Sequence, residues 1–373
     1  MKNTIFLANI EYSKSSGIFK KIYVQSKVIS KMSSCYLVCK KQTHIYIIEF
    51  KNGEVLSKNI INIKPSIRNM LSEVKKIVKE KNICRIYFRS TLKPSFKQVI
   101  FFHFLYRRGI KIYYEIPTYP YFMEQVNASN NKIFTFVKLM YEKIIFQLSY
   151  FYIYKVLVVI SKNNVRRKKK FVEITNGVEL NRFQIILPTN SLPQKKITFI
   201  GVGTLYNYHG YSRLIKAIGE FYKKNNEYII VFNIVGNGPA IGDLKKYVEV
   251  LGLEDNVIFH GVLHGRKLDD LFSKADIGVG ALALYERNAD IDTTLKVVEY
   301  ISRGLPVITS GVLKSIEHRE MVFQVDNCDT VINLSRIINE YHHFKEVVTI
   351  DLLEENRKNF DWSIIMEKVF NDK

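Results

Sequence analysis

The residues Thr294–Ser310, TLKVVEYISRGLPVITS, combine three chemical features in one predicted helix and the strand after it. The amides of a helix's first turn have no partner within the helix and carry partial positive charge, so they can hold a diphosphate. Lys296 adds a cation at the same end of the helix, and Glu299 follows at a distance that suits ribose hydroxyls. The pattern is typical of a nucleotide site, although a single copy of it is not specific.

Two glycine pairs precede this segment, and each is predicted to follow a strand. They are Gly201-Val202-Gly203 and Gly236-Asn237-Gly238. A dinucleotide-binding fingerprint requires a third glycine, but Tyr206 and Ile241 occupy those positions, which argues against a dehydrogenase. The glycines instead allow the backbone to approach a diphosphate closely and to turn sharply from a strand into a helix.

The order of these motifs resembles that of a known enzyme family. TNGVELNRF at Thr175–Phe183, VGNGP at Val235–Pro239 and NVIFHGVL at Asn256–Leu263 come before that helix. The chain resembles the nucleotide-sugar glycosyltransferases of the two-domain GT-B type, specifically glycosyltransferase family 4. The resemblance implies an α/β fold with two Rossmann-like domains, whose parallel sheets face each other across a cleft.

The resemblance also sets expected domain boundaries. Residues 1–182 would form an acceptor-binding domain, residues 183–194 a linker, and residues 195–350 a nucleotide-sugar-binding domain. Residues 351–373 would form a C-terminal helix that returns to the first domain and carries Trp362 into an apolar contact.

The resemblance implies which residues hold the donor, but the chain departs from the family at two cation positions. Thr204 and His209 stand where the family usually has an arginine and a lysine. Arg213, one helical turn further on, or Lys296 can supply the missing cation, and the alternative for Lys296 is a side chain that faces solvent. We predict His209 and Arg213 as catalytic residues. The residues predicted to bind the donor are Gly203, Thr204, Gly236, Asn237, Asp290, Asp292, Thr293, Thr294, Leu295, Lys296 and Glu299.

Many family members carry two glutamates separated by seven residues. Glu299 matches the second of them, whereas Ile291 occupies the place of the first. The acids nearby are Glu286, Asp290 and Asp292, and we favour the two aspartates as hydrogen-bond partners of the sugar hydroxyls. A surface loop rich in acids is the alternative.

The segment Tyr114–Tyr121, YEIPTYPY, is the notable motif of the first half. Glu115 falls at the carboxyl end of a predicted parallel strand, where ligands of open α/β folds bind. The segment resembles the EIPTYPY of bacterial capsule and exopolysaccharide glycosyltransferases. We predict Glu115 as a catalytic residue that orients the acceptor hydroxyl or takes its proton, and a structural turn is the alternative.

Alternating strands and helices are expected to position these residues, which predicts parallel sheets covered by helices. In the first half, the expected strands are Thr4–Ala8, His44–Phe50, Cys84–Phe88, Lys111–Glu115 and Val156–Ser161, with helices at Ile18–Lys31, Pro65–Lys79 and Ser95–Arg107. In the second half, the expected strands are Lys196–Gly201, Tyr228–Gly236, Val257–Gly261, Ile277–Ala281 and Pro306–Ser310, with helices at Tyr211–Lys223, Ile241–Leu251, Lys267–Lys274 and Thr294–Arg303.

The charge of the chain is divided unevenly between its halves. The 373 residues, a length that suits two domains, carry a net charge of +21. Residues 1–190 contain 34 Lys and Arg against 10 Glu and no Asp, a balance of +24, which leaves −3 for residues 191–373. A basic half can attract nucleic acid or an anionic membrane, and part of the excess can be solvated lysine.

Residues 132–155, KIFTFVKLMYEKIIFQLSYFYIYK, interleave aromatic and aliphatic side chains with lysines. This mixture is typical of a helix at a membrane interface, and a core helix with snorkelling lysines is the alternative. The basic run Arg166–Lys170 follows it, whereas the uncharged stretch Ile144–Tyr154 is too short to span a bilayer. Four cysteines without a paired pattern indicate a reducing compartment, so we expect a cytoplasmic protein peripheral to the inner face of the plasma membrane.

Three functional hypotheses follow. The first is a retaining glycosyltransferase of bacterial capsule, exopolysaccharide or O-antigen biosynthesis. The resemblance implies that it takes a nucleoside diphosphate sugar as donor and a lipid-linked saccharide as acceptor, without a metal or other cofactor. The second is a nucleotide-sugar epimerase of the same fold. The third is a basic nucleic-acid-binding protein, but the chain contains no known nucleic-acid motif, so we expect no nucleic acid partner.

Overall fold

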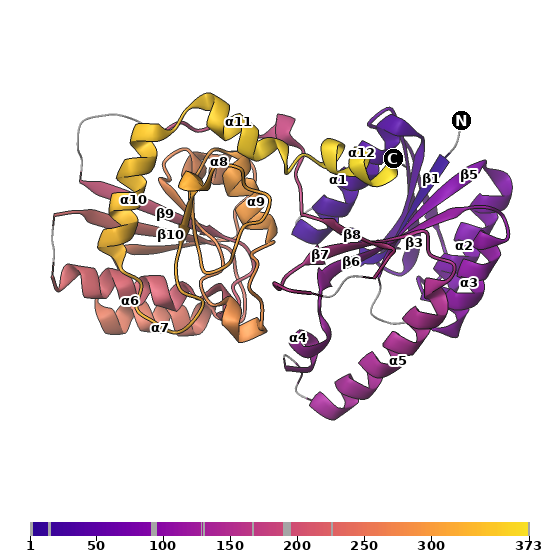
Figure 1. Cartoon of the computed structure of the whole chain (residues 1–373), viewed down its shortest axis with the longest axis horizontal. Coiled ribbons are helices and arrows are strands. Elements are labelled where there is room, and N and C mark those ends of the chain that lie inside the picture. Colours follow the sequence, from indigo (N-terminus) through magenta and orange to yellow (C-terminus); the bar gives the residue numbers. More distant parts are fainter. Residues whose placement is uncertain are drawn as a thin grey trace. The chain divides into compact units, whose positions relative to one another are not determined.

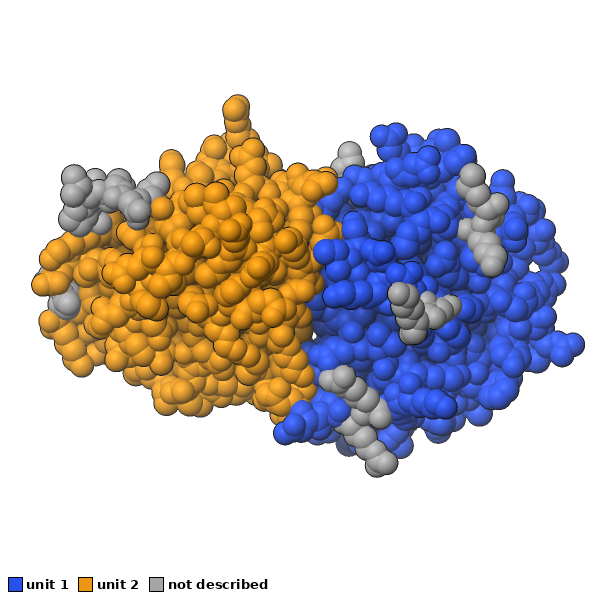
Figure 2. Space-filling model, turned by 45° about the horizontal axis from the view of Figure 1, so that its top comes forward, with its two compact units in different colours: residues 1–160, 164–179, 362–373 blue, residues 161–163, 180–361 orange. Residues whose placement is uncertain are grey.

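The computed structural model describes residues 3–13, 16–90, 95–127, 129, 131–165, 168–188, 195–224 and 227–371. The chain divides into two compact units (Figure 2). Unit 1 comprises residues 1–160, 164–179 and 362–373, and unit 2 comprises residues 161–163 and 180–361. Part of the expected linker, residues 189–194, lies outside the described residues.

Unit 1 is built on an eight-stranded sheet in the order β4-β3-β2-β1-β5-β6-β7-β8 (Figure 1). The pairs β2–β3 and β3–β4 are antiparallel, and the other neighbouring pairs are parallel. The strands are β1 (Asn3–Glu11), β2 (Cys35–Lys41), β3 (His44–Lys51), β4 (Glu54–Ile61), β5 (Ile83–Arg89), β6 (Lys111–Tyr119), β7 (Lys155–Ile160) and β8 (Phe171–Ile174).

The helices of unit 1 begin at side-chain caps that the sequence supplies. Ser16 accepts a hydrogen bond from the amide of Phe19 at the start of α1, and Asn131 accepts one from Phe134 at the start of α5. Such caps satisfy an amide that the helix itself leaves unpaired. The helices are α1 (Gly17–Met32), α2 (Ile67–Glu80), α3 (Phe96–Tyr106), α4 (Phe122–Asn127) and α5 (Lys132–Tyr150).

The last helix of the chain, α12 (Trp362–Phe370), belongs to unit 1 and packs against α1 (Figure 1). The side chain of Trp362 is fully buried in the core of the unit, and its amide donates to the carbonyl of Val178 at 3.1 Å. The ammonium of Lys155 donates to the carbonyl of Val369 at 2.9 Å. The expected boundary at residue 351 falls instead after Asp361, because the chain from 351 to 361 packs within unit 2.

Unit 2 contains a six-stranded parallel sheet in the order β11-β10-β9-β12-β13-β14. Its strands are β9 (Lys196–Val202), β10 (Ile229–Val235), β11 (Val257–Gly261), β12 (Ile277–Val279), β13 (Val307–Thr309) and β14 (Val322–Gln324). From β9, the chain first adds β10 and β11 on one side and then adds β12 to β14 on the other. The reversal falls between β9 and β12. Ligands of such sheets usually bind outside the carboxyl ends of the strands at this point, and we call this position the crevice.

Within the described residues, unit 2 has six helices that connect and cover these strands. α6 packs against both α7 and α10, and α11 packs against α9. The helices are α6 (Tyr211–Tyr222), α7 (Ile241–Leu251), α8 (Arg266–Phe272), α9 (Leu295–Ser302), α10 (Leu334–Val347) and α11 (Ile350–Lys358). Across the described parts of both units, no helix combines the length and apolarity needed to cross a membrane.

Candidate nucleotide-sugar site

The two glycine pairs form loops that touch each other at the carboxyl ends of β9 and β10. Gly203 has φ +139° and Gly236 has φ +134°, and the amide of Gly203 donates to the carbonyl of Val235 at 3.0 Å. A Cβ atom on Gly236 would lie 1.9 Å from the carbonyl oxygen of Gly203. A Cβ atom on Gly238 would lie 2.4 Å from the carbonyl oxygen of Leu205. The loops therefore pack backbone against backbone, while the predicted donor-binding residues Thr204 and Asn237 are exposed beside them.

Lys296 lies at the crevice between β9 and β12. Its ammonium donates to the carbonyl of Gly280, directly after β12, at 2.9 Å and to the hydroxyl of Tyr211 at 3.2 Å. Burial lowers the pKa of Lys296 to about 7, against the opposing attraction of Asp292. The alternative in which Lys296 faces solvent is therefore wrong, and its role in binding a diphosphate stays a prediction.

The start of α9 leaves its amides open. Thr294 caps the helix without a side-chain hydrogen bond, and the neighbouring Thr293 and Leu295 are half-buried. Because first-turn amides have no partner within a helix, those of α9 can donate hydrogen bonds to an anion that lies beside Lys296. Glu299 follows Lys296 by three residues and so lies on the same face of the helix.

His209 is buried at 7% exposure and cannot serve as the replacement cation. Burial, together with the charges of Lys296 and Arg287, lowers the pKa of His209 to about 2, so its imidazole is neutral. Its Nδ1 atom is buried and finds no hydrogen-bond partner among the described residues. A neutral ring can form hydrogen bonds but cannot pair with a charge, and the buried Nδ1 atom is not accessible to a ligand from solvent.

Arg213 does not face the crevice as a free cation. Its guanidinium donates to the backbone carbonyls of Leu282, Asp326 and Thr330, and its side chain is buried. These bonds fix the loops after β12 and β14, which corrects the prediction that Arg213 grips the diphosphate.

Asp292 is the acid that positions α9. Its Oδ1 atom accepts hydrogen bonds from the hydroxyl of Thr294 at 2.7 Å and from the amide of the same residue at 3.0 Å. Its Oδ2 atom accepts from the amide of Ala281 at 2.9 Å and from the hydroxyl of Thr309 at 2.8 Å. Since both oxygens are used within the unit, the predicted role of Asp292 in binding the sugar is not supported.

Asp290 keeps a more open carboxylate. It is half-buried, and its Oδ2 atom accepts from the amide of Asn163 at 3.2 Å. Glu286, the third acid considered for this position, is exposed. Asp290 thus remains the predicted acid with the most capacity for a ligand.

Two tyrosines that the sequence reasoning missed pack against strands β9 and β12. The Tyr211 ring occupies the space that a Cβ atom on Gly201 would take, at 2.6 Å, and Tyr300 does the same at Gly278, at 2.5 Å. The hydroxyl of Tyr300 accepts from the amide of Val202 at 2.8 Å. Glycines inside strands were the available signal, because each marks a close approach by a neighbouring group.

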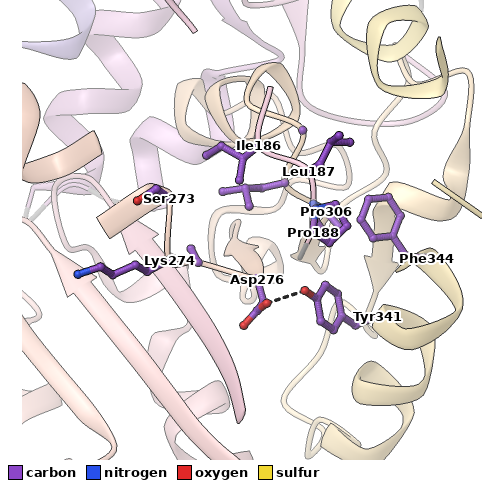
Figure 3. A pocket seen from close by; sticks show the side chains of 12 residues that line it. Ile186, Leu187, Pro188, Ser273, Lys274, Asp276, Pro306, Tyr341 and Phe344 are labelled. Carbon is purple, nitrogen blue, oxygen red and sulfur yellow. Dashed lines mark hydrogen bonds between the residues drawn. The ribbon is translucent and has the colours of Figure 1, made fainter. Parts of the chain in front are cut away.

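Among the hollows that the described residues form, two lie in unit 2. The larger, about 810 Å³ with open solvent included, adjoins the first glycine loop and the starts of α6 and α7. The smaller, about 430 Å³, is lined by the starts of β12 and β13, by residues 186–188 and by Tyr341, whose hydroxyl donates to Asp276 (Figure 3). Because the smaller hollow lies at the amino ends of the strands, it is separate from the crevice at their carboxyl ends.

Glu115 lies in unit 1 at the centre of a buried polar cluster. Its carboxylate accepts hydrogen bonds from Lys21 at 3.0 Å, from the hydroxyl of Tyr87 at 2.6 Å, and from Gln25 and Arg89. Burial alone would raise the pKa of Glu115, but Lys21 and Arg89 outweigh it and lower the pKa to about 2. A fully buried carboxylate of this kind is a poor proton acceptor, so the geometry favours the structural alternative.

A comparison with protein families bears on the class of protein. Residues 194–340 match the family model described as glycosyl transferases group 1. No curated protein sequence matches the chain significantly.

In the part of the chain that the structure describes, no group of three or more His, Cys, Asp or Glu side chains is placed to hold a metal ion.

Solved structures resemble the chain over nearly its whole length. The sucrose-phosphate synthase of Thermosynechococcus elongatus has a TM-score of 0.64 and 14% identity, covering 99% of this chain and 98% of that one. HepE of Anabaena, in complex with UDP and glucose, has a TM-score of 0.63 and 14% identity, with 99% and 98% covered. WaaG, a glycosyltransferase involved in lipopolysaccharide biosynthesis, has a TM-score of 0.58 and 12% identity, with 99% and 100% covered.

These likenesses confirm the predicted GT-B fold. The family match supports a glycosyltransferase, with a glycosyl transferases group 1 domain at residues 194–340 of unit 2. The first of the three functional hypotheses is therefore the one supported, at the level of the enzyme class.

Proposed function

We propose that the protein transfers a sugar from a nucleoside diphosphate sugar to a lipid-linked saccharide at an anionic membrane surface, in the assembly of a bacterial surface polysaccharide. The transfer retains the anomeric configuration of the sugar and uses no metal. The observation that carries the proposal is an apolar stripe on the solvent face of α5.

The stripe consists of residues that recur every three or four positions along α5 and so share one face. Ile133 is 80% exposed, Val137 61% and Ile144 55%. We call the α5 stripe the set Ile133, Val137, Met140, Tyr141, Ile144, Leu148 and Phe151. Leu139, Glu142, Ile145 and Ser149 are buried on the opposite face. A core helix with snorkelling lysines does not account for this face, because contiguous exposed apolar patches mark interaction surfaces.

Basic side chains border the α5 stripe. Lys132 and Lys143 are exposed on the helix itself, and Lys168 and Lys169 are exposed on the loop after β7. Near an anionic bilayer, each such cation contributes about 1 kcal/mol of attraction. Apolar side chains that enter the headgroup layer, flanked by cations, match an anionic membrane better than they match a protein partner or nucleic acid.

The donor half of the proposal uses the crevice of unit 2. HepE, a structural neighbour, binds UDP, which makes UDP the first nucleotide to test. The glycine loops, the open amides of α9 and Lys296 would surround the diphosphate. Negative charge grows on the departing diphosphate as its bond to the sugar breaks, and these groups would stabilise that charge. The acceptor hydroxyl would attack the same face of the sugar, while neutral His209 donates or accepts a hydrogen bond there.

The membrane half is tested by flotation with lipid vesicles. We expect the wild-type protein to float with vesicles containing anionic phospholipid and to float much less with purely zwitterionic ones. The double variant Ile144→Glu/Leu148→Glu should bind anionic vesicles at least about tenfold more weakly, since burying two apolar side chains is worth several kcal/mol. Val250→Glu is the matched control, because Val250 is 71% exposed on α7 in the other unit. Equal flotation of the two variants would contradict the membrane role of α5.

The donor half is tested by thermal stabilisation with UDP, GDP, dTDP, CMP and their sugars. A ligand at 100 times its dissociation constant adds about 2.7 kcal/mol to the stability of the folded state. One nucleotide should raise the melting temperature, and Glu299→Ala should reduce the shift. If no nucleotide raises it, the proposed donor class is wrong.

A further inference from the structure

Arg303 ends α9 and joins three separate segments of unit 2. Its guanidinium lies 4.0 Å from the ring centre of Phe272, at the end of α8, and 4.7 Å from that of Phe183. Its side chain is only 10% exposed. A cation held between two aromatic faces has little freedom to move, and an arginine suits this position because its planar group stacks while it donates in its own plane.

The same guanidinium holds Glu299 by one oxygen only. The Oε1 atom of Glu299 accepts from Nε of Arg303 at 3.1 Å and from a terminal nitrogen at 2.9 Å. A terminal nitrogen also donates to Asp269 at 2.8 Å. No described residue donates to the Oε2 atom of Glu299, and its side chain is 27% exposed. One carboxylate oxygen is thus fixed and the other remains able to accept from a ligand.

The backbone at Arg303 fixes the segment that carries Phe183. The carbonyl of Arg303 accepts from the amide of Ile186 at 2.7 Å. Gly304 has φ +83°, and a Cβ atom there would lie 3.0 Å from the carbonyl oxygen of Ile186. Arg357 of α11 donates to the carbonyl of Phe183 at 2.9 Å. The segment from 183 to 186 therefore lies close against the end of α9, where Arg303 bonds to it, and it is also held by α11.

We infer that Arg303 is the positioning residue for Glu299, and that Phe183 and Phe272 belong to the donor site because they hold Arg303 in place. The inference rests on the proposed function, in which Glu299 binds the ribose of the donor. Arg303 orients Glu299 so that Oε2 accepts from the ribose hydroxyls, and it partly neutralises the carboxylate beside the diphosphate. The ligand class that this arrangement selects is a ribonucleotide rather than a 2′-deoxyribonucleotide.

A purely structural role for Arg303 would lower stability without changing what the site selects. Isothermal titration with UDP and with dUDP separates the two roles, because dUDP lacks the 2′-hydroxyl. We expect wild-type protein to bind UDP at least about tenfold more tightly than dUDP, the worth of a hydrogen bond to a charged group. Glu299→Ala and Arg303→Gln should each reduce this ratio towards one. Phe183→Leu, which keeps an apolar side chain but removes the stacked ring, should reduce it partly.

Two further measurements complete the experiment. In a Glu299→Ala background, Arg303→Gln should not weaken UDP binding further, since Arg303 acts through Glu299. Arg336→Gln is the matched control, because Arg336 pairs with Glu340 in the same four-residue spacing on an exposed part of α10 and should leave the ratio unchanged. Any folded variant of Arg303 that keeps the wild-type ratio of dissociation constants overturns the inference while the proposed function stands. A wild-type protein that binds no nucleotide contradicts the proposed function itself, and the inference falls with it.

Discussion

Under the proposed function, Lys296 makes donor binding depend on pH in a direction that follows from the burial of its ammonium. Burial lowers the pKa of this ammonium from 10.5 to about 7, so the group is charged below pH 7 and mostly neutral above it. A bound diphosphate supplies negative charge and raises the pKa again. Binding above pH 7 must therefore take up a proton, and the affinity must fall as the pH rises.

The size of the effect follows from the pKa. At pH 8, a group with a pKa of about 7 is roughly one-tenth charged, so binding takes up about 0.9 proton. Between pH 6 and pH 8, the apparent affinity should weaken about tenfold, which corresponds to about 1.4 kcal/mol. His209 does not add to this dependence, because its pKa of about 2 keeps it neutral throughout the range.

Titration calorimetry in two buffers of different ionisation enthalpy measures the proton uptake directly. UDP-glucose is the suitable probe, because the terminal phosphate of free UDP titrates near pH 6 and would obscure the result. Lys296→Met should bind the probe more weakly, with no proton uptake and with little dependence on pH. If wild type and Lys296→Met take up the same number of protons at pH 8, the assignment of Lys296 to the diphosphate is refuted.

Two further substitutions test the frameworks of the two units. Glu115→Gln should destabilise unit 1 by about 3–5 kcal/mol in urea unfolding, because Lys21 then loses its buried partner, while Glu220→Gln on the exposed surface should leave the stability nearly unchanged. Since the pKa of Glu115 is lowered to about 2, its contribution is present above pH 4.5 and is lost as the pH falls from 4.5 to 2. Gly236→Ala should abolish nucleotide-dependent thermal stabilisation, because its Cβ atom would force the glycine loops apart. Gly242→Ala, where a Cβ atom meets nothing within 4 Å, should keep the nucleotide-dependent stabilisation, and its loss in this variant would contradict the role given to the glycine loops. A Glu115→Gln protein with the stability of the wild type would contradict the role given to the buried cluster.

Elements with both a local pattern and an end signal could be predicted closely. Strand β11 and helix α7 have the predicted bounds, Val257–Gly261 and Ile241–Leu251. In α7, the buried Leu244 and Val248 recur at helical spacing, and Gly252 ends the helix with φ +63°. Such segments can be predicted from the sequence because the apolar pattern and the terminating glycine indicate the same bounds.

Other elements were missed. Strand β4, Glu54–Ile61, is largely exposed and has no apolar face that would indicate a strand. It pairs with β3 in antiparallel register across the two-residue turn Asn52-Gly53, where both residues have positive φ, and this local hairpin signal was overlooked. The expected single C-terminal helix is likewise two helices, α11 and α12, and they belong to different units.

The candidate site could also be predicted only in part, because the sequence indicates where the loops lie but not which hydrogen-bond partners the charged side chains have. Glycine spacing and strand ends correctly marked the loops around the crevice, because those features act through the backbone alone. Arg213 in the first turn of α6, Asp292 in the loop before α9 and Glu115 within β6 were also predicted, yet each forms its hydrogen bonds with neighbouring groups of its own unit. Whether an ionisable side chain faces a ligand depends on the hydrogen bonds that the fold has already supplied to it, and the residue type does not contain that information. Lys296 and Glu299 differ from these three because each has a neighbour that orients it and a side chain that is not fully buried. This combination of an orienting contact and remaining capacity, rather than charge at a strand end, is the physical reason to place the donor at α9.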